Sequence, residues 1–102
     1  LGPAERKHAR APARIEALKA RWPKIRAGLN ARALPTPAQA RAPLMEVGAP
    51  HTLAALGVDR DTARSTLIRA RDIRDRLTVL DLAFEIGVLP ARADAVLDAA
   101  GV

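Results

Sequence analysis

The scarcity of strand-forming side chains is the strongest constraint on the fold of this chain. Alanine occupies 23 of the 102 positions, whereas there are only six Val, five Ile, one Phe, one Trp and no Tyr. Alanine has the highest intrinsic helix propensity, while β-branched and aromatic residues are the ones that strands favour. We therefore predict an all-α fold, a small bundle of about six short helices.

Prolines, glycines and capping residues predict where these helices begin and end. Residues 1–11 contain no apolar stripe, so we expect a frayed basic lead-in there, followed by a helical segment or domain over residues 12–102. Pro12 can open the first helix, and Pro23 is expected to end or kink it after Trp22. A new helix is expected to follow each later break. The predicted spans are 37–47, with a kink or late start at Pro43, then 53–56, 59–76, 78–86 and 90–100.

The apolar residues of these helices include few large side chains. A chain of this length with so little aromatic volume is expected to build a thin core. Residues 78–86 are an exception, because their apolar positions cover two faces, and we expect this helix to be buried on most sides. Some of the remaining apolar surface is expected to meet a partner or the rest of a longer chain. The first residue is Leu rather than Met, so we also expect other residues to precede it.

The positive charge is concentrated at one end of the chain. The formal net charge is +6, but residues 1–32 alone hold nine basic and two acidic residues, a net of +7. One interpretation is a solvated surface in a protein that uses Arg as its ordinary polar residue; the other is a phosphate-binding patch. No interleaved aromatics and no helix-turn-helix or zinc-finger signature accompany the charge, so we do not expect nucleic acid as a partner. A free-standing basic helical module that binds nucleic acid through residues 6–32, or a protein-interaction module, is the alternative function.

Catalytic and metal-binding patterns are missing from the sequence. The chain has no Cys, which excludes disulfides and thiolate metal sites, and its two His, His8 and His51, are not spaced as zinc ligands. The six glycines are dispersed, so no phosphate-cradling loop is present. No apolar run is long enough to span a membrane and no signal peptide is recognisable, which favours a cytoplasmic location. We assign no catalytic, cofactor-binding or metal-binding residue to this chain.

One arginine interrupts an apolar stripe in the predicted 59–76 helix. At about 100° per residue, Arg74 falls in the middle of the apolar face. A buried guanidinium must be paired or hydrogen-bonded. Arg74 either forms an internal pair, with Asp81 or a helix C-terminus, or faces a cleft where it could bind a phosphate or carboxylate. The apolar face itself consists of Ala63, Leu67, Ala70, Ile73 and Leu77.

Several motifs in the chain match a known pattern. Residues 70–83 read ARDIRDRLTVLDLA and residues 85–89 read EIGVL, after a GAP at 48–50 and an LGVD at 56–59. Upstream, Trp22-Pro23 with Ile25 and then Leu34-Pro35 fit the pattern W-P-x-I and L-P. Together, over about residues 18–90, these motifs resemble the C-terminal end of sn-glycerol-1-phosphate dehydrogenases, in the iron-containing alcohol dehydrogenase and dehydroquinate synthase-like superfamily. Leu77 stands where this family usually has Tyr.

This resemblance implies that the chain is the C-terminal part of a larger helical metal-binding domain. The parent enzyme would use NAD(P) and a divalent metal, Zn, Ni or Fe, to exchange a hydride with glycerol phosphate or a related polyol. Its nucleotide-binding and metal-ligating segments have no counterpart in this chain and would be its partners, and a homo-oligomer is a further expectation. The resemblance also implies residues that reach the substrate or a domain interface, for which the candidates are Arg74, Arg76, Thr78 and Asp81.

Overall fold

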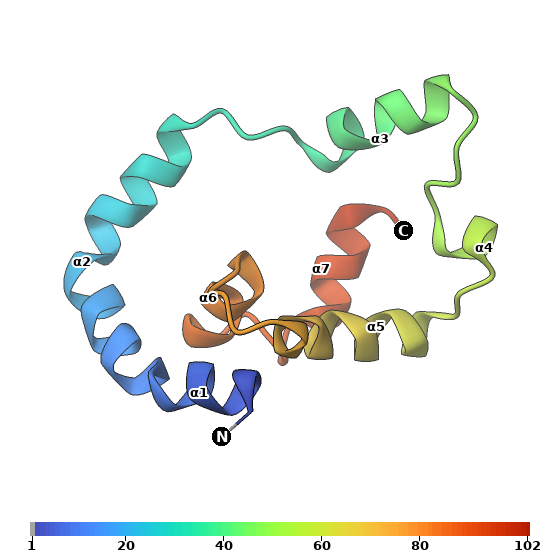
Figure 1. The fold of residues 1–102 in the computed structure, drawn as a ribbon. Coiled ribbons are helices and arrows are strands. Elements are labelled where there is room, and N and C mark those ends of the chain that lie inside the picture. The colour runs from blue at the N-terminus through green and yellow to red at the C-terminus, as the bar shows by residue number, and fades with distance from the viewer. Residues whose placement is uncertain (1) are drawn as a thin grey trace.

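The computed structural model describes residues 2–102, and the prediction of an all-α fold is confirmed (Figure 1). Helical residues make up 70% of the chain, and residues 2–102 contain no strand. None of the helices described is long and apolar enough to cross a bilayer. The helices are α1 (Pro3–Ala9), α2 (Ala11–Ala31), α3 (Pro37–Glu46), α4 (Leu53–Leu56), α5 (Arg60–Arg69), the 3-10 helix η1 (Ala70–Ile73), α6 (Val79–Glu85) and α7 (Ala93–Ala100).

Side-chain caps and left-handed glycines set several of these boundaries as predicted. The hydroxyl of Thr36 accepts a hydrogen bond from the Gln39 amide, which begins α3. Asp59 accepts one from the Thr62 amide at 2.7 Å and begins α5. These acceptors satisfy amides that have no partner within the helix.

Other boundaries correct the sequence prediction. Residues 3–9 form α1, so the expected frayed lead-in is wrong for them. Helix α2 continues through Pro23 to Ala31, so Pro23 does not end it, and α3 already begins at Pro37 and continues through Pro43, so it does not start late. An interior proline removes one hydrogen bond, and the helix-forming residues on both sides can sustain the helix across that gap.

The predicted long helix over 59–76 is shorter in the structure. Helix α5 ends at Arg69, η1 adds one tighter turn, and Arg74 has extended backbone angles. The last helix also begins later than expected, at Ala93, because Pro90 lies in a preceding turn instead of at its first position. The chain between η1 and α6, residues 74–78, is therefore a loop rather than helix.

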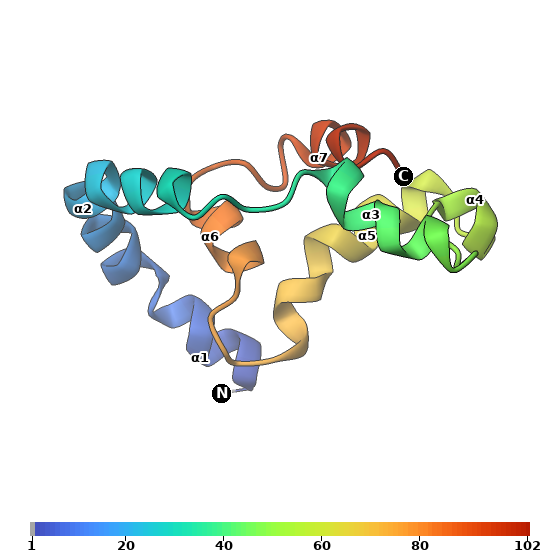
Figure 2. The same cartoon turned by 90° about the horizontal axis from the view of Figure 1, so that it is seen from above.

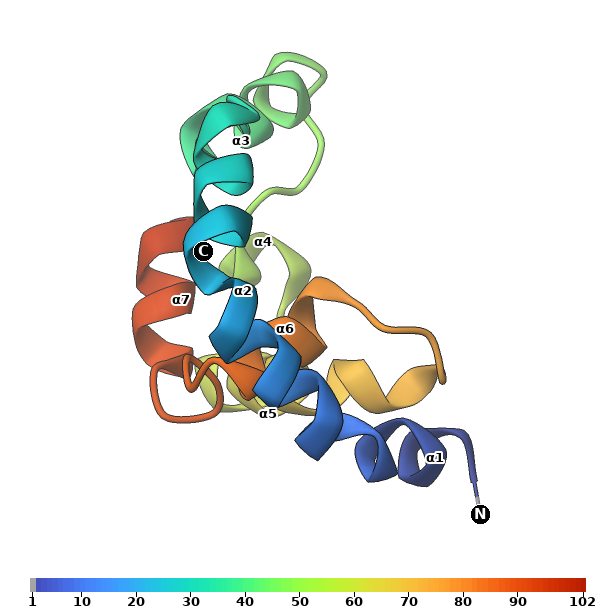
Figure 3. The same ribbon diagram turned by 90° about the vertical axis from the view of Figure 1, so that its left-hand side faces the viewer.

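The helices are arranged as a ring with two helices inside it. Figure 1 shows α1 to α5 running around the periphery, with α6 and α7 enclosed. Figure 2 shows α6 between α2 and α5, and Figure 3 shows α1 and α3 at opposite ends of the molecule. Helix α7 packs on α3 and α5, while η1 packs on α1, α5 and α6. The radius of gyration is 15.8 Å, against about 13 Å for a compact domain of this length.

The apolar core is thin, as expected, and lies where α5 meets α7. Its buried residues are one alanine of α5 and three residues on or just before α7, at intervals of four along the chain. Alanines at this crossing allow the helix backbones to approach closely. The expectation that residues 78–86 are buried on most sides is wrong, because Val79 is 75% exposed and Ile86 is also exposed. The core residues are Ala63, Leu89, Ala93 and Leu97.

Two glycines in open surroundings offer a test of these backbone assignments. Gly57 has φ +67° after α4, whereas Gly28 lies inside α2, and a Cβ would meet no atom within 4 Å at either position. We expect Gly57→Ala to destabilise the fold by about 1 kcal/mol, because of the left-handed conformation. Gly28→Ala should stabilise it by about 0.5–1 kcal/mol. Urea unfolding followed by circular dichroism measures both changes, and equal effects of the two substitutions would contradict the assigned backbone.

Candidate functional site

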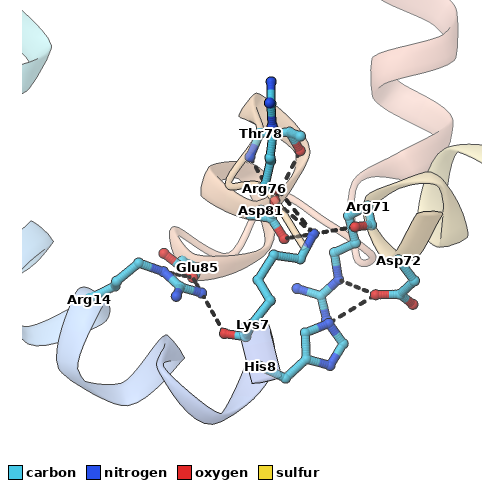
Figure 4. A network of polar contacts seen from close by, with 9 residues as sticks. All are labelled: Lys7, His8, Arg14, Arg71, Asp72, Arg76, Thr78, Asp81 and Glu85. Atoms are coloured by element: carbon cyan, nitrogen blue, oxygen red, sulfur yellow. Dashed lines mark hydrogen bonds and ion pairs between the residues drawn. The ribbon is translucent and has the colours of Figure 1, made fainter. Parts of the chain in front are cut away.

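A buried lysine joins the first helix to the loop before α6. The Nζ atom of Lys7 lies 3.0 Å and 3.1 Å from the two carboxylate oxygens of Asp81 (Figure 4). It also donates to the backbone carbonyls of Arg71 and Arg76, the latter at 3.5 Å. Lys7 is 4% exposed and Asp81 is 1% exposed. We call this set, with Thr78, the Lys7 cluster.

Asp81 also holds the start of α6. Its Oδ2 atom accepts hydrogen bonds from the Thr78 amide at 2.8 Å and from the Thr78 hydroxyl at 3.0 Å, which is a capping arrangement at the first turn of α6. Burial of the carboxyl group favours its neutral form. The hydrogen bonds from Lys7 and Thr78, together with the Lys7 charge, outweigh this effect and lower the pKa of Asp81 below its usual value.

A second ion pair fastens α2 to α6. Arg14 donates from Nε and Nη2 to the same oxygen of Glu85, at 2.8 Å and 2.5 Å, and also to the Lys7 carbonyl at 3.1 Å. The Glu85 side chain is 4% exposed. The Arg14–Glu85 pair therefore joins α1, α2 and α6 beside the Lys7 cluster (Figure 4).

More exposed contacts surround η1. His8 Nε2 lies 2.9 Å from Asp72, and the Arg71 guanidinium lies 3.6 Å above the centre of the Phe84 ring. The cation–π geometry places Arg71 over the face of the ring, where the ring quadrupole attracts a cation. Side chains of α1, η1 and α6 thus hold one another through polar contacts in a region with little apolar core.

The structure brings three of the four predicted site residues together and leaves one apart. Thr78 and Asp81 belong to the Lys7 cluster by their side chains, and Arg76 belongs to it by its carbonyl. The Arg74 side chain is exposed and makes no hydrogen bond or ion pair within the described residues. The predicted position of Arg74 on a buried apolar stripe is wrong, because the helix ends before this residue. The partner of Asp81 is Lys7 and not Arg74.

Sequence reasoning missed Lys7 and Glu85 as members of this network. For Lys7 the sequence did contain one indication: only three of its 17 basic residues are Lys, so a Lys is an unusual choice in this chain. An ammonium has three donors around a point charge, whereas a guanidinium is a planar fork. The three acceptor groups around Nζ suit the ammonium. No comparable pattern in the sequence distinguishes Glu85 from a solvated residue.

The chemistry of the Lys7 cluster is that of a structural clamp. The three donors of Lys7 face three acceptor groups, so no lone pair is available for nucleophilic or base chemistry while the clamp is closed. Within residues 2–102, no group of three or more His, Cys, Asp or Glu is placed to hold a metal ion. The described residues therefore provide no site for the metal that the resemblance implies.

Comparisons with known proteins add no identification. No family model matches the chain, and neither the curated proteins nor the solved structures contain a significant match.

The Lys7 clamp predicts a large loss of stability when one partner is removed. Lys7→Met leaves the buried Asp81 charge without its counterion, and we expect a loss of about 3–5 kcal/mol in the free energy of unfolding. The control is Lys19→Met, which removes an exposed pair with Glu16 at 3.0 Å and should change stability little. Both are measured by urea unfolding, and comparable small losses in the two variants would contradict the clamp.

The lowered pKa of Asp81 predicts how this contribution varies with pH. A carboxyl whose folded pKa is depressed contributes its full stability above the unfolded pKa, about 3.9, and loses that contribution as the pH falls through the folded value. The stability difference between the native chain and Asp81→Asn should therefore be largest near neutral pH and shrink below about pH 4. Urea titrations of both proteins across this range measure it. A difference that stays constant into acid would show that the Asp81 charge is unimportant.

Proposed function

We propose that this chain is the C-terminal helical part of a metal- and NAD(P)-dependent polyol dehydrogenase of the glycerol-1-phosphate dehydrogenase-like type. It supports the active site of that enzyme and is not catalytic alone. The proposal combines the motifs over residues 18–90 with one structural observation, the extent of uncovered apolar surface.

Large apolar side chains remain exposed along much of the ring. Val47, for example, is 77% exposed, and several of these residues gather between residues 29 and 56, where α3 and α4 have little packed against them. A chain that is complete by itself would cover more of this surface, because each large apolar side chain gains free energy on leaving water. The exposed large apolar residues are Leu29, Leu34, Leu44, Met45, Val47, Leu56, Ile73, Leu77, Val79, Ile86 and Val102.

The Lys7 cluster has a definite role in this proposal. It fixes the loop over residues 74–78, which lies within the 70–83 motif of the resemblance. Thr78 and Asp81 hold the end of the loop, and the exposed Arg74 side chain has no hydrogen-bond or ion-pair partner within the described residues. Arg74 therefore anchors the chain to the catalytic helices of the parent enzyme, or reaches the substrate phosphate, and it is the residue on which the proposal is tested.

The nicotinamide cofactor and the Zn, Ni or Fe ion belong, in this proposal, to the parent segments that bind nucleotide and metal. The chain contributes packing and positioned charge to them. A cytoplasmic location and assembly of several enzyme copies are parts of the same proposal.

The alternative, a nucleic-acid-binding module over residues 6–32, has less support. Several of the basic residues there have acidic partners within the chain: Lys7 is buried against Asp81, Arg14 binds Glu85 and Lys19 binds Glu16. These partners reduce the charge available for phosphate contacts, on which such binding depends.

The test uses the full-length polypeptide that contains this sequence, assayed for NAD(P)H formation from sn-glycerol-1-phosphate with Zn, Ni or Fe supplied. We expect turnover by that polypeptide and none by the 102-residue chain alone. If Arg74 binds the substrate phosphate, Arg74→Ala should raise the Michaelis constant for that substrate about tenfold. If Arg74 anchors the chain to the catalytic helices, the substitution should lower the stability of the enzyme by about 1 kcal/mol, the effect of one lost charged contact. Arg26→Ala, on the exposed side of α2, is the matched control.

Two results would contradict the proposal. Absence of turnover with every metal would remove the dehydrogenase assignment. An unchanged Michaelis constant together with unchanged stability in Arg74→Ala would remove Arg74 from both of its roles.

A further inference from the structure

The longest helix that the structure describes buries none of its own residues. Helix α2 has 21 residues, and every large apolar side chain on it stays partly open to water. In proteins a helix gains most of its stability by packing an apolar face against other elements. The apolar face of α2 therefore lacks the cover that a helix of this length normally has.

The large apolar residues of α2 follow the alternating spacing of a coiled-coil seam. They are separated by three, four, three and four positions, which places them along one narrow stripe of the helix. Charged residues lie directly beside this stripe, so it is narrower than the broad apolar face of a helix that lies on a lipid surface. The pattern favours another helix as the covering element. The stripe consists of Ile15, Leu18, Trp22, Ile25 and Leu29.

Two hollows between α2 and α6 open beside this stripe (Figure 2). The larger has a volume of about 500 Å³ and is lined by Trp22 and by Ile86, which is 41% exposed. The smaller has a volume of about 210 Å³ and is lined by Ile25 and Leu82. Leu18 lies in the wall of both hollows. Such hollows suit the apolar side chains that an amphipathic helix presents at intervals of three and four residues.

The charged side chains beside the two hollows leave an excess of positive charge. Glu85 lies in the wall of both, but its side chain is 4% exposed and is neutralised by Arg14. Lys19 borders the larger hollow and Arg21 the smaller. Lys19 has only its exposed contact with Glu16, and Arg21 has no hydrogen-bond or ion-pair partner within the described residues.

The positions on either side of a helical seam determine which helix pairs with it. At about 100° per residue, Lys19 and Arg21 fall on opposite sides of the stripe. Opposite charges attract across such a seam and like charges repel. A second copy of α2 would bring Lys19 and Arg21 against the same two residues, so self-pairing is disfavoured. A helix with Glu or Asp at its own flanking positions is attracted on both sides.

We propose that the stripe and its two hollows, together the α2 groove, bind an amphipathic helix of a partner protein. The partner helix has apolar residues on one face and Glu or Asp along both edges of that face. Trp22 is the central anchor, because large aromatic side chains contribute most to contacts of this kind. Lys19 and Arg21 select the acidic partner. The inference does not depend on the proposed dehydrogenase function, and its test measures binding without turnover.

The probe is a fluorescein-labelled helical peptide as long as α2, with Leu at its seam positions and Glu at its flanking positions. A second peptide carries Lys at the flanking positions. Fluorescence anisotropy with the full-length protein, at physiological salt, measures the binding of each. We expect saturable one-to-one binding of the Glu peptide, at least about tenfold tighter than that of the Lys peptide. Arg21→Glu should weaken binding of the Glu peptide and strengthen binding of the Lys peptide, because it reverses a selecting charge.

Lys24→Glu is the matched control. It reverses the same charge at an exposed position of the same helix, but Lys24 lines neither hollow. Both peptides should bind this variant as they bind the native protein. Trp22→Ala should weaken both peptides by about tenfold or more, because it removes the anchor of the groove. Circular dichroism confirms that each variant is folded.

Three outcomes would overturn the proposal. The first is absence of saturable binding of the Glu peptide, which is also the result expected if another segment of the same polypeptide fills the groove. The second is equal binding of the two peptides, or equal effects of Arg21→Glu and Lys24→Glu. The third is a dimer in sedimentation that Trp22→Ala dissociates, because the occupant of the groove would then be a second copy.

Discussion

The Lys7 ammonium lies at the meeting point of α1, η1 and α6, and the surrounding structure depends on how it is neutralised. Asp81 supplies the counter-charge and at the same time caps α6 through Thr78, so one carboxylate fixes both the docking of α1 and the start of α6. The carbonyls of Arg71 and Arg76 complete the shell around Nζ and hold the intervening loop. A thin apolar core at the α5–α7 crossing could not position these elements by itself.

A buried ion pair is weak evidence for net stability, because its two charges lose their hydration on folding. Its value in this chain is specificity of arrangement. An ammonium and a carboxylate that are both inaccessible to water tolerate few alternatives, whereas alanine-rich helix faces could slide past one another with little change in packing. The Arg14–Glu85 pair adds a second fixed point between α2 and α6. Polar contacts therefore determine how the N-terminal helices dock, while α7 docks on α5 through apolar contacts together with the ion pairs of Arg60 with Asp94 and Asp98.

The uncovered apolar surface along the ring of helices supports the functional proposal. Exposed large residues between 29 and 56 favour burial against further protein, which agrees with a helical part of a larger dehydrogenase.

The sequence by itself determined the helical class and many of the helix ends. Alanine content, the caps at Thr36 and Asp59, and glycines such as Gly57 act through local backbone energetics, which neighbouring residues are enough to define. Only the tertiary structure decided that α5 stops short of Arg74 and that Asp81 pairs with Lys7, 74 residues away along the chain. This pairing depends on the bend of the chain between η1 and α6, and on the packing of the helices, which places the Lys7 ammonium beside Asp81. The helical periodicity of residues 70–76 could predict neither the early end of α5 nor the Lys7–Asp81 pair. A periodicity argument assumes a continuous helix, and it contains no information about contacts between distant segments.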